Sequence, residues 1–182
     1  MIKKIFKVIR WVLSLTFIST ILAVVAYRFI PVYFTPLMIS RCFEQIGKGE
    51  SVKLYHDWIP LEKMPKSMPV AVMASEDRSW LRKGLEVYFT FLIETLWSKQ
   101  RIMEVYLNSI EMGDGIYGVE ACAEHNFGKE AIQLTRRDCA LIAATLPNPR
   151  RFSSKTPGPY MRKRIGQIEH QMTFITAFPE EH

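Results

Sequence analysis

The hydrophobic pattern divides the chain into one long uncharged stretch near the N-terminus and several shorter amphipathic ones. Residues 11–27 contain no charged side chain, and the apolar run resumes after Arg28 with Phe29 and Ile30. A helix of this length is just long enough to cross a bilayer, with the Arg28 side chain extended toward the headgroups. We therefore expect a transmembrane anchor over residues 11–30.

The ten residues before this anchor are basic, with Lys3, Lys4, Lys7 and Arg10 and no acid. Such a cluster is typical of a cytoplasmic tail, so the rest of the chain is predicted to lie on the other side of the membrane. A cleaved signal peptide is the alternative, with residues 24–26 as the cleavage site. Its apolar core is usually about 7–15 residues long, shorter than this run, so we expect an uncleaved anchor.

Proline marks the end of the anchor and the beginning of a different region. Pro31 and Pro36 are expected to stop the helix. Residues 31–60 mix aromatic side chains with two glycines, and we interpret them as a membrane-proximal stalk. They are either amphipathic and interfacial or the irregular start of the domain. The domain itself is predicted over residues 61–182.

Apolar residues in this domain recur three and four positions apart, which is the helical period. Ser98 is a candidate N-cap, Thr135 and Asp138 resemble a capping box, and Gly128 fits a left-handed C-terminal cap. No alternating strand pattern is found, and the glycines of residues 112–118 indicate a loop. The sequence predicts a predominantly α domain, with helices over residues 70–77, 85–97, 99–108, 119–126, 135–144 and 160–178.

Composition narrows the choice of partner. The chain has 182 residues, room for one domain and an anchor, and a formal net charge of +6. This charge suits anionic lipid or a phosphate-bearing substrate; nucleic acid is disfavoured because the basic residues form no known reader motif. Three cysteines, Cys42, Cys122 and Cys139, fit neither a disulfide framework nor a zinc site. We expect Cys122 and Cys139 to be small buried residues.

The first candidate chemical group is the acidic pair Glu76-Asp77, which ends an apolar helix. A carboxylate that is partly desolvated there has a raised pKa and is suited to proton transfer near neutrality. The alternative is a pair of ordinary exposed acids at a helix end. Spacing by itself favours this second interpretation.

The second candidate is a cationic group. Arg82, Lys83 and Glu86 lie at helical offsets of three and four, so they share one face. That spacing is usual for a surface ion pair, but it also suits a clamp for a pyrophosphate, which an arginine can bind in bidentate fashion. Glu104 has the position of a buried structural acceptor.

Taken together, these blocks resemble the peptidoglycan glycosyltransferases of glycosyltransferase family 51, in particular their monofunctional branch with one membrane anchor. The resemblance covers nearly the whole chain after the anchor. It rests on these motifs: Glu76-Asp77, Arg82-Lys83-x-x-Glu86, Lys99-x-x-Ile-Met-Glu104-x-Tyr106-Leu-Asn108, Ala121-x-Ala123, Phe127-Gly128-Lys129 and Leu146-Pro-Asn-Pro.

The resemblance implies a lysozyme-like helical domain on the outer face of a bacterial inner membrane. It implies polymerisation of lipid II into glycan strands, with release of undecaprenyl pyrophosphate and inversion at the anomeric carbon. Glu76 matches the general base, and Arg82 and Lys83 match the pyrophosphate-binding pair. Glu86 matches a catalytic glutamate at the donor pyrophosphate, where a divalent cation (Mg or Mn) can assist. No other cofactor is implied.

The resemblance gives the remaining motif residues supporting parts. Asp77, Lys99 and Asn108 are expected on the substrate-binding side of the site. Glu104 and Tyr106 are expected to support its structure. The implied partners are lipid II, the growing glycan strand, the membrane and other cell-wall synthesis or division proteins.

The sequence departs from the family pattern in one place. Trp80 is followed directly by Leu81 and Arg82, so a histidine, a Gln-Gln motif and several dozen residues that normally separate the first and third motifs are missing. We interpret this as an internal deletion near residues 80–81 and expect weak or absent polymerase activity. Two alternatives stay open: a catalytically inactive membrane-anchored remnant that acts as an interaction module, and a lysozyme-like peptidoglycan hydrolase.

Overall fold

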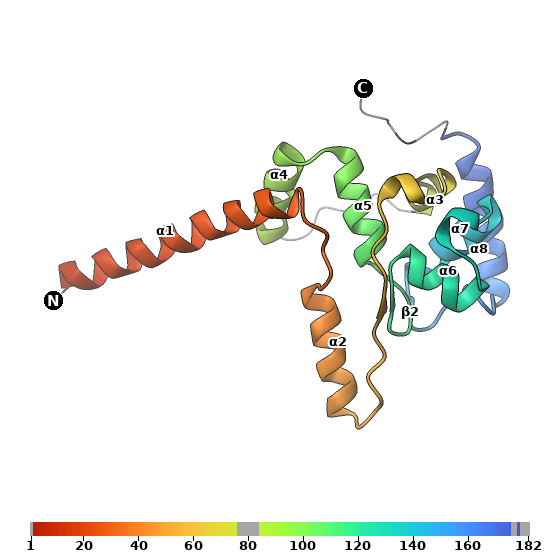
Figure 1. Cartoon of the computed structure of the whole chain (residues 1–182), viewed down its shortest axis with the longest axis horizontal. Helices are drawn as coiled ribbons and strands as arrows, with labels where there is room; N and C mark the ends of the chain where they lie inside the picture. Colours follow the sequence, from red (N-terminus) through yellow and green to blue (C-terminus); the bar gives the residue numbers. More distant parts are fainter. Residues whose placement is uncertain (1, 76–83, 176–177, 179–182) are drawn as a thin grey trace.

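The computed structural model describes residues 2–75, 84–175 and 178, and the side chains of residues 2, 3, 5 and 84–89 are outside this description. The described chain is mostly helical, which confirms the predominantly α prediction (Figure 1). Its elements in order are α1 (Ile2–Tyr27), α2 (Pro36–Gly47), β1 (Tyr55–His56), the 3-10 turn η1 (Leu61–Lys63), α3 (Ser67–Ser75), α4 (Gly84–Leu96), α5 (Lys99–Ser109), β2 (Glu111–Gly113), β3 (Ile116–Tyr117), α6 (Val119–Phe127), η2 (Ala131–Gln133), α7 (Arg136–Thr145) and α8 (Pro159–Met172).

Residues 11–27 of the predicted anchor lie in α1, which extends away from the rest of the molecule (Figure 1). Residues 28–30, which were also predicted as part of the anchor, lie beyond the end of this helix. The helix begins at Ile2, so the basic tail is helical too. Its segment Phe6–Tyr27 is long and apolar enough to cross a membrane, and its side chains are almost all exposed. So much exposed apolar surface is unfavourable in water, and it is what a helix surrounded by lipid presents. The segment is therefore a candidate membrane span.

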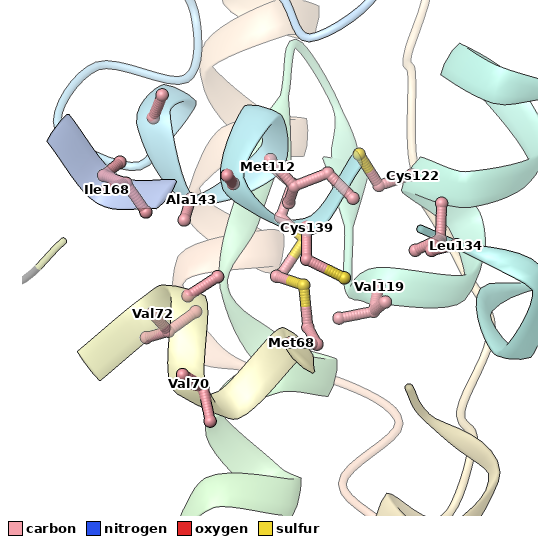
Figure 2. Close-up of a cluster of buried hydrophobic side chains, with 14 of the residues drawn as sticks. Met68, Val70, Val72, Met112, Val119, Cys122, Leu134, Cys139, Ala143 and Ile168 are labelled. Carbon is pink, nitrogen blue, oxygen red and sulfur yellow. The ribbon is translucent and has the colours of Figure 1, made fainter. Parts of the chain in front are cut away.

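The core of the domain forms where α3, α7 and α8 pack together. Because α3 is apolar on all sides, it can be buried all round, and its residues Val70, Ala71 and Val72 are buried. Figure 2 shows Met68 and Ile168 within this cluster. Cys122 and Cys139 are both 0% exposed, which confirms the expectation that they are small core residues.

The predicted helix boundaries are confirmed where a capping residue defined them. The Ser98 hydroxyl accepts a hydrogen bond from the Arg101 backbone N–H at 3.1 Å and so caps α5. Thr135 and Asp138 bond to each other's backbone N–H groups at the start of α7. Gly128 ends α6 with φ +64°, the left-handed conformation expected of it.

The structure differs from prediction in the region of residues 31–60. Pro36 does not stop a helix there but begins α2, because Thr35 caps it by accepting from the Met38 N–H at 3.2 Å. Strand β1 also lies in this region and pairs in parallel with β3. The segment is therefore joined to the domain through β1.

The glycine-rich segment 112–118 is only partly a loop. Strand β2 pairs with β3 in antiparallel fashion, and with β1 they form a small sheet in the order β1-β3-β2. The expectation of no strand was wrong because strands of two or three residues are too short to show an alternating pattern. Helix α8 is also shorter than predicted and ends at Met172 rather than residue 178.

The close approach of Gly118 to the backbone of Asn108 can be tested directly by substitution. Gly118 has φ +84°, and a Cβ atom there would lie 2.8 Å from the Asn108 carbonyl oxygen. We expect Gly118→Ala to lower the free energy of unfolding by about 2–3 kcal/mol, from backbone strain and the close contact together. The measurement is thermal unfolding in detergent by circular dichroism.

Gly166→Ala is the matched control, because Gly166 lies within α8 and a Cβ there would meet no atom within 4 Å. Alanine is the better helix former, so this variant should gain up to about 1 kcal/mol. Equal losses in both variants would contradict the assigned packing of Gly118.

Candidate functional site

The candidate base Glu76 follows directly after α3, whose last residue is Ser75. Glu76 itself lies outside the described residues, as do Asp77, Arg82 and Lys83, so their expected roles stay predictions. What the structure does describe is the helix that leads to Glu76. Ser75 is 8% exposed, and its hydroxyl donates to the Val72 carbonyl at 2.8 Å. The described part of α3 thus ends at a buried point within the domain.

Arg164 of α8 holds this end of α3. Its guanidinium Nη2 donates to the Ser75 carbonyl oxygen at 2.8 Å, and the side chain is partly buried. A cation at the C-terminal end of a helix also interacts favourably with the helix dipole. Arg164 therefore fixes the position from which Glu76 begins. The sequence analysis missed this residue, because nothing in the order of residues shows that α8 reaches the end of α3.

The other expected catalytic carboxylate, Glu86, lies near the start of α4. Its backbone is helical, and its side chain is among those not described. Residues 82 and 83 precede α4, so the shared helical face that was expected for Arg82, Lys83 and Glu86 is not tested by this structure.

Helix α5 carries the other motif residues, but it does not bring them to one point. Lys99 is its first residue and is exposed, whereas Asn108 lies nine residues later and is fully buried. Nine residues of helix correspond to about 13 Å of rise and a rotation of about 180°. Lys99 and Asn108 therefore lie on opposite sides of α5 and do not converge on a single ligand.

The Asn108 side chain joins α5 to the segment around Ile59 by hydrogen bonds, and we call these bonds the Asn108 clip. The Asn108 Nδ2 donates to the carbonyl oxygens of Ile59 and Glu104, both at 2.8 Å, and its Oδ1 accepts from the Ile59 N–H at 2.9 Å. The buried amide is thus bonded to backbone on both sides. This geometry supports a structural role better than the substrate contact expected for Asn108.

Glu104 and Tyr106 lie on the same helix and are both partly buried. Tyr106 packs against the apolar core, and its expected supporting part stays a prediction. Glu104 forms an ion pair with Arg101 one turn earlier, at 3.3 Å between Nη1 and Oε2, with both side chains largely buried.

Arg101 itself joins α5 to the anchor, a contact that the sequence analysis missed. Its guanidinium donates to the carbonyl oxygens of Tyr27, at 2.9 Å, and Ile30, at 2.5 Å, just where α1 ends. It also lies over the rings of Trp58 and Trp97, at 5.2 and 5.9 Å from their centroids. These cation–π contacts and hydrogen bonds hold one planar group from several sides.

Two further hydrogen bonds strengthen the same junction. The Trp97 indole N–H donates to the Val24 carbonyl at 2.7 Å, and Arg28 Nη1 donates to the Leu96 carbonyl at 2.6 Å. The Leu96 carbonyl at the end of α4 is thus bonded by a side chain of a distant part of the chain, since helix ends leave carbonyls without intrahelical partners. The Val24 carbonyl accepts from the Arg28 backbone N–H as well, at 3.2 Å. We call the contacts among Arg28, Trp97 and Arg101 and the end of α1 the anchor junction.

The described residues contain no group of three or more His, Cys, Asp and Glu side chains placed to hold a metal ion. The expected divalent cation was assigned to Glu86, whose side chain is not described. Its presence therefore stays a proposal.

Comparison with known proteins defines the class of protein that carries this fold. The family model described as "Transglycosylase" matches residues 78–173. The chain belongs to the transglycosylase family, as its motifs predicted. The match begins beside the expected junction near residues 80–81.

Full-length relatives support the same assignment. The chain is similar to a biosynthetic peptidoglycan transglycosylase of Bacteroides thetaiotaomicron, at 44% identity over 98% of this chain and 90% of the relative. Proteins with the same description in Stutzerimonas stutzeri (36% identity, 91% and 86% covered) and Pseudomonas aeruginosa (35%, 93% and 91%) are also similar to it.

These alignments also bear on length. The alignment with the Bacteroides protein runs over 224 residues, whereas this chain has 182. At least 42 residues of that relative, within the matched region, therefore have no counterpart here. A shortened chain was predicted from the motifs; its location near residues 80–81 stays a prediction.

The Asn108 clip can be tested with a nearly isosteric change. Asn108→Asp replaces the amide donor by an acceptor that faces two carbonyl oxygens in a buried place. We expect a loss of about 2–4 kcal/mol in the free energy of unfolding. The thermal midpoint in detergent measures it, with Asn148→Asp at an exposed position as the control that should change little. A midpoint for Asn108→Asp equal to that of the parent would exclude the clip.

The anchor junction can be tested with Arg101→Lys, which keeps the charge but loses the planar fork. We expect faster amide hydrogen exchange in residues 28–35 and a loss of about 1–2 kcal/mol in stability. Arg137→Lys is the control, because Arg137 is 71% exposed and makes one long ion pair, of 3.8 Å, with Glu169. Unchanged exchange in residues 28–35 would show that Arg101 does not hold the end of α1.

Proposed function

We propose that this chain is a membrane-anchored peptidoglycan glycosyltransferase that uses lipid II, with Glu76 as its general base. Family membership supports the reaction class. The single observation that supports the residue is the position of Glu76: it follows directly on a mostly apolar and mostly buried helix, whose last described carbonyl is held by Arg164. Partial withdrawal of the Glu76 carboxylate from water is part of this proposal, since desolvation raises the pKa of a carboxyl group and suits it to proton transfer at neutral pH.

In the proposed reaction, Glu76 takes the proton of the acceptor sugar's 4-hydroxyl. That oxygen forms a bond to the anomeric carbon of the donor from the face opposite its pyrophosphate, and the bond from carbon to pyrophosphate breaks. The configuration is inverted in this single displacement. Arg82 and Lys83 neutralise the negative charge that develops on the departing undecaprenyl pyrophosphate. A divalent cation at Glu86 is proposed as an aid to this neutralisation.

The location follows from the substrate, since a lipid-linked donor stays in the bilayer. We propose that α1 spans the bacterial inner membrane with the basic N-terminus in the cytoplasm and the domain outside it. The candidate span Phe6–Tyr27 and its exposed apolar side chains support the anchor. The anchor junction then keeps α5 next to the membrane surface.

A second candidate, an inactive anchored remnant, is supported by the shorter length of this chain relative to the Bacteroides protein. Missing substrate contacts reduce the positioning on which the transfer depends. We therefore expect activity well below that of a full-length relative. Hydrolysis of peptidoglycan is less well supported, because a neutral glycosidic bond needs no cationic pair at the leaving group.

The test is lipid II polymerisation by the purified chain in detergent, run beside Glu76→Gln. We expect short strands or slow formation from the parent and a further loss of at least about 100-fold in the variant, the range of general-base catalysis. Glu62→Gln is the matched control, an exposed acid in η1 that should leave the rate unchanged.

The possible outcomes separate the candidates. Strands from the parent and from Glu62→Gln, but not from Glu76→Gln, would support the proposed enzyme and its base. Equal rates in the parent and Glu76→Gln would exclude Glu76 as the base. No strands from any of them, with folded protein by circular dichroism, would favour the inactive remnant.

A further inference from the structure

We propose that the outward face of α2, together with the loop that leads into it, is a lipid-contacting surface lying in the headgroup region of the bilayer. This inference rests on the anchor proposed for α1. It adds a second membrane contact, made by the domain itself. We call this surface the α2 lipid face; its residues are Phe29, Ile30, Tyr33, Phe34, Ile39, Phe43 and Ile46.

The helix contributes a regular apolar stripe to this surface. Ile39, Phe43 and Ile46 follow one another at spacings of four and three, so they lie on one side of α2. Their exposed fractions are 50%, 70% and 59%. A helix with an exposed apolar stripe and an opposite polar side has the form of an interfacial helix.

The opposite side of α2 is held by the domain, which fixes the direction of the stripe. Met38 is 0% exposed, and Gln45 Oε1 accepts from the Lys53 backbone N–H at 2.7 Å. Arg41 lies 3.6 Å from the buried Glu111 of β2. Arg41 lies opposite the stripe, and Met38 and Gln45 lie between, about 100–130° around the helix from it. Rotation of α2 that would bury Ile39 and Phe43 would break the contacts of all three.

An ion-pair group further along α2 adds to the same restraint. Glu44 pairs with Lys48 at 2.7 Å and with Arg150 at 3.3 Å, and Arg150 belongs to the loop after α7. The hydrogen bond from Lys48 holds the pKa of Glu44 down at about 2. The contact with Arg150 is the one that ties α2 to a distant part of the domain, because Lys48 directly follows α2 itself.

The arrangement of the helices directs the stripe toward the membrane. Figure 1 shows α2 crossing the direction of α1 at the side of the domain from which α1 departs, with β2 on the other side of α2. Since the polar side of α2 is turned to β2, its apolar side faces the direction in which α1 extends. A helix that crosses a membrane span in this way lies along the membrane plane.

The connecting loop makes the apolar surface continuous from the span to α2. Residues 28–35 join the two helices, and Phe29 and Phe34 are 74% and 67% exposed. The anchor junction fixes the end of α1 on the domain, so this loop and α2 are at the level where the span leaves the bilayer. Tyrosine and tryptophan are enriched at that level, and Tyr33 and Trp97 fit this pattern.

The continuity with the span is what commits this surface to lipid rather than to another protein. Lipid must surround the end of α1 on every side that the domain leaves open. An adjoining surface of large exposed apolar residues would meet that lipid without any further change of conformation. In water the same patch would be an aggregation hazard.

The test measures the depth of single nitroxide labels in the full chain reconstituted into phosphatidylglycerol–phosphatidylethanolamine vesicles. The background is Cys42→Ser. Cys122 and Cys139 can stay, because both are fully buried and burial raises the pKa of each thiol to about 11. Labels are placed by Phe43→Cys in the α2 lipid face, Leu15→Cys in α1 and Ile132→Cys in η2.

Ile132 is the matched control, an exposed apolar residue (53%) that is outside α2 and the loop before it. The ratio of collisions with oxygen to collisions with a water-soluble nickel complex measures contact with lipid. We expect this ratio to be at least about threefold higher at position 43 than at position 132, and higher still at position 15.

Each outcome decides the proposal. A lipid-like ratio at position 15 with a water-like ratio at position 43 would overturn the α2 lipid face and leave the anchor standing. Water-like ratios at both would overturn both. Spin–spin broadening at position 43 that grows with protein concentration would assign the face to a second copy of the chain, also against the proposal. None of these readings depends on catalysis, so they separate this inference from the proposed activity.

Discussion

One guanidinium group, that of Arg101, joins parts of the chain that lie far apart in the sequence. It binds backbone carbonyls at the end of α1, lies over the rings of Trp58 and Trp97, and pairs with Glu104 on its own helix. A planar cation with five donors can satisfy these different partners at once, whereas a lysine cannot. The orientation of the domain relative to its anchor depends on this contact.

A second set of contacts holds the place where the candidate base begins. Helix α3 is surrounded by α7 and α8, and Arg164 binds its last carbonyl. On the far side of α5, the Asn108 amide holds the chain at Ile59. Polar groups buried in this way are satisfied by backbone partners, which favours one arrangement over others. The helices α3, α5, α7 and α8 are thus held together by specific contacts, although the chain is shorter than its Bacteroides relative.

The anchor junction and the α2 lipid face have a common consequence for the proposed reaction. A span fixes one point of the domain at the membrane but leaves it free to rotate about that point. A second contact along the membrane plane removes much of this freedom. Reduced freedom lowers the entropic cost of bringing a lipid-linked donor and the domain into a productive orientation.

The sequence by itself determined the elements whose signals are local. The uncharged run defined the span, Ser98, Thr135 and Gly128 defined helix ends, and the spaced motifs identified the family, because each of these depends on residues a few positions apart. The tertiary structure decided the contacts across long separations: Arg101 with Tyr27, Arg164 with Ser75, Asn108 with Ile59, and the pairing of β1 with β3. It also turned Pro36 from an expected helix stop into a helix start. Such contacts depend on how helices pack in space, and no periodicity along the chain encodes them.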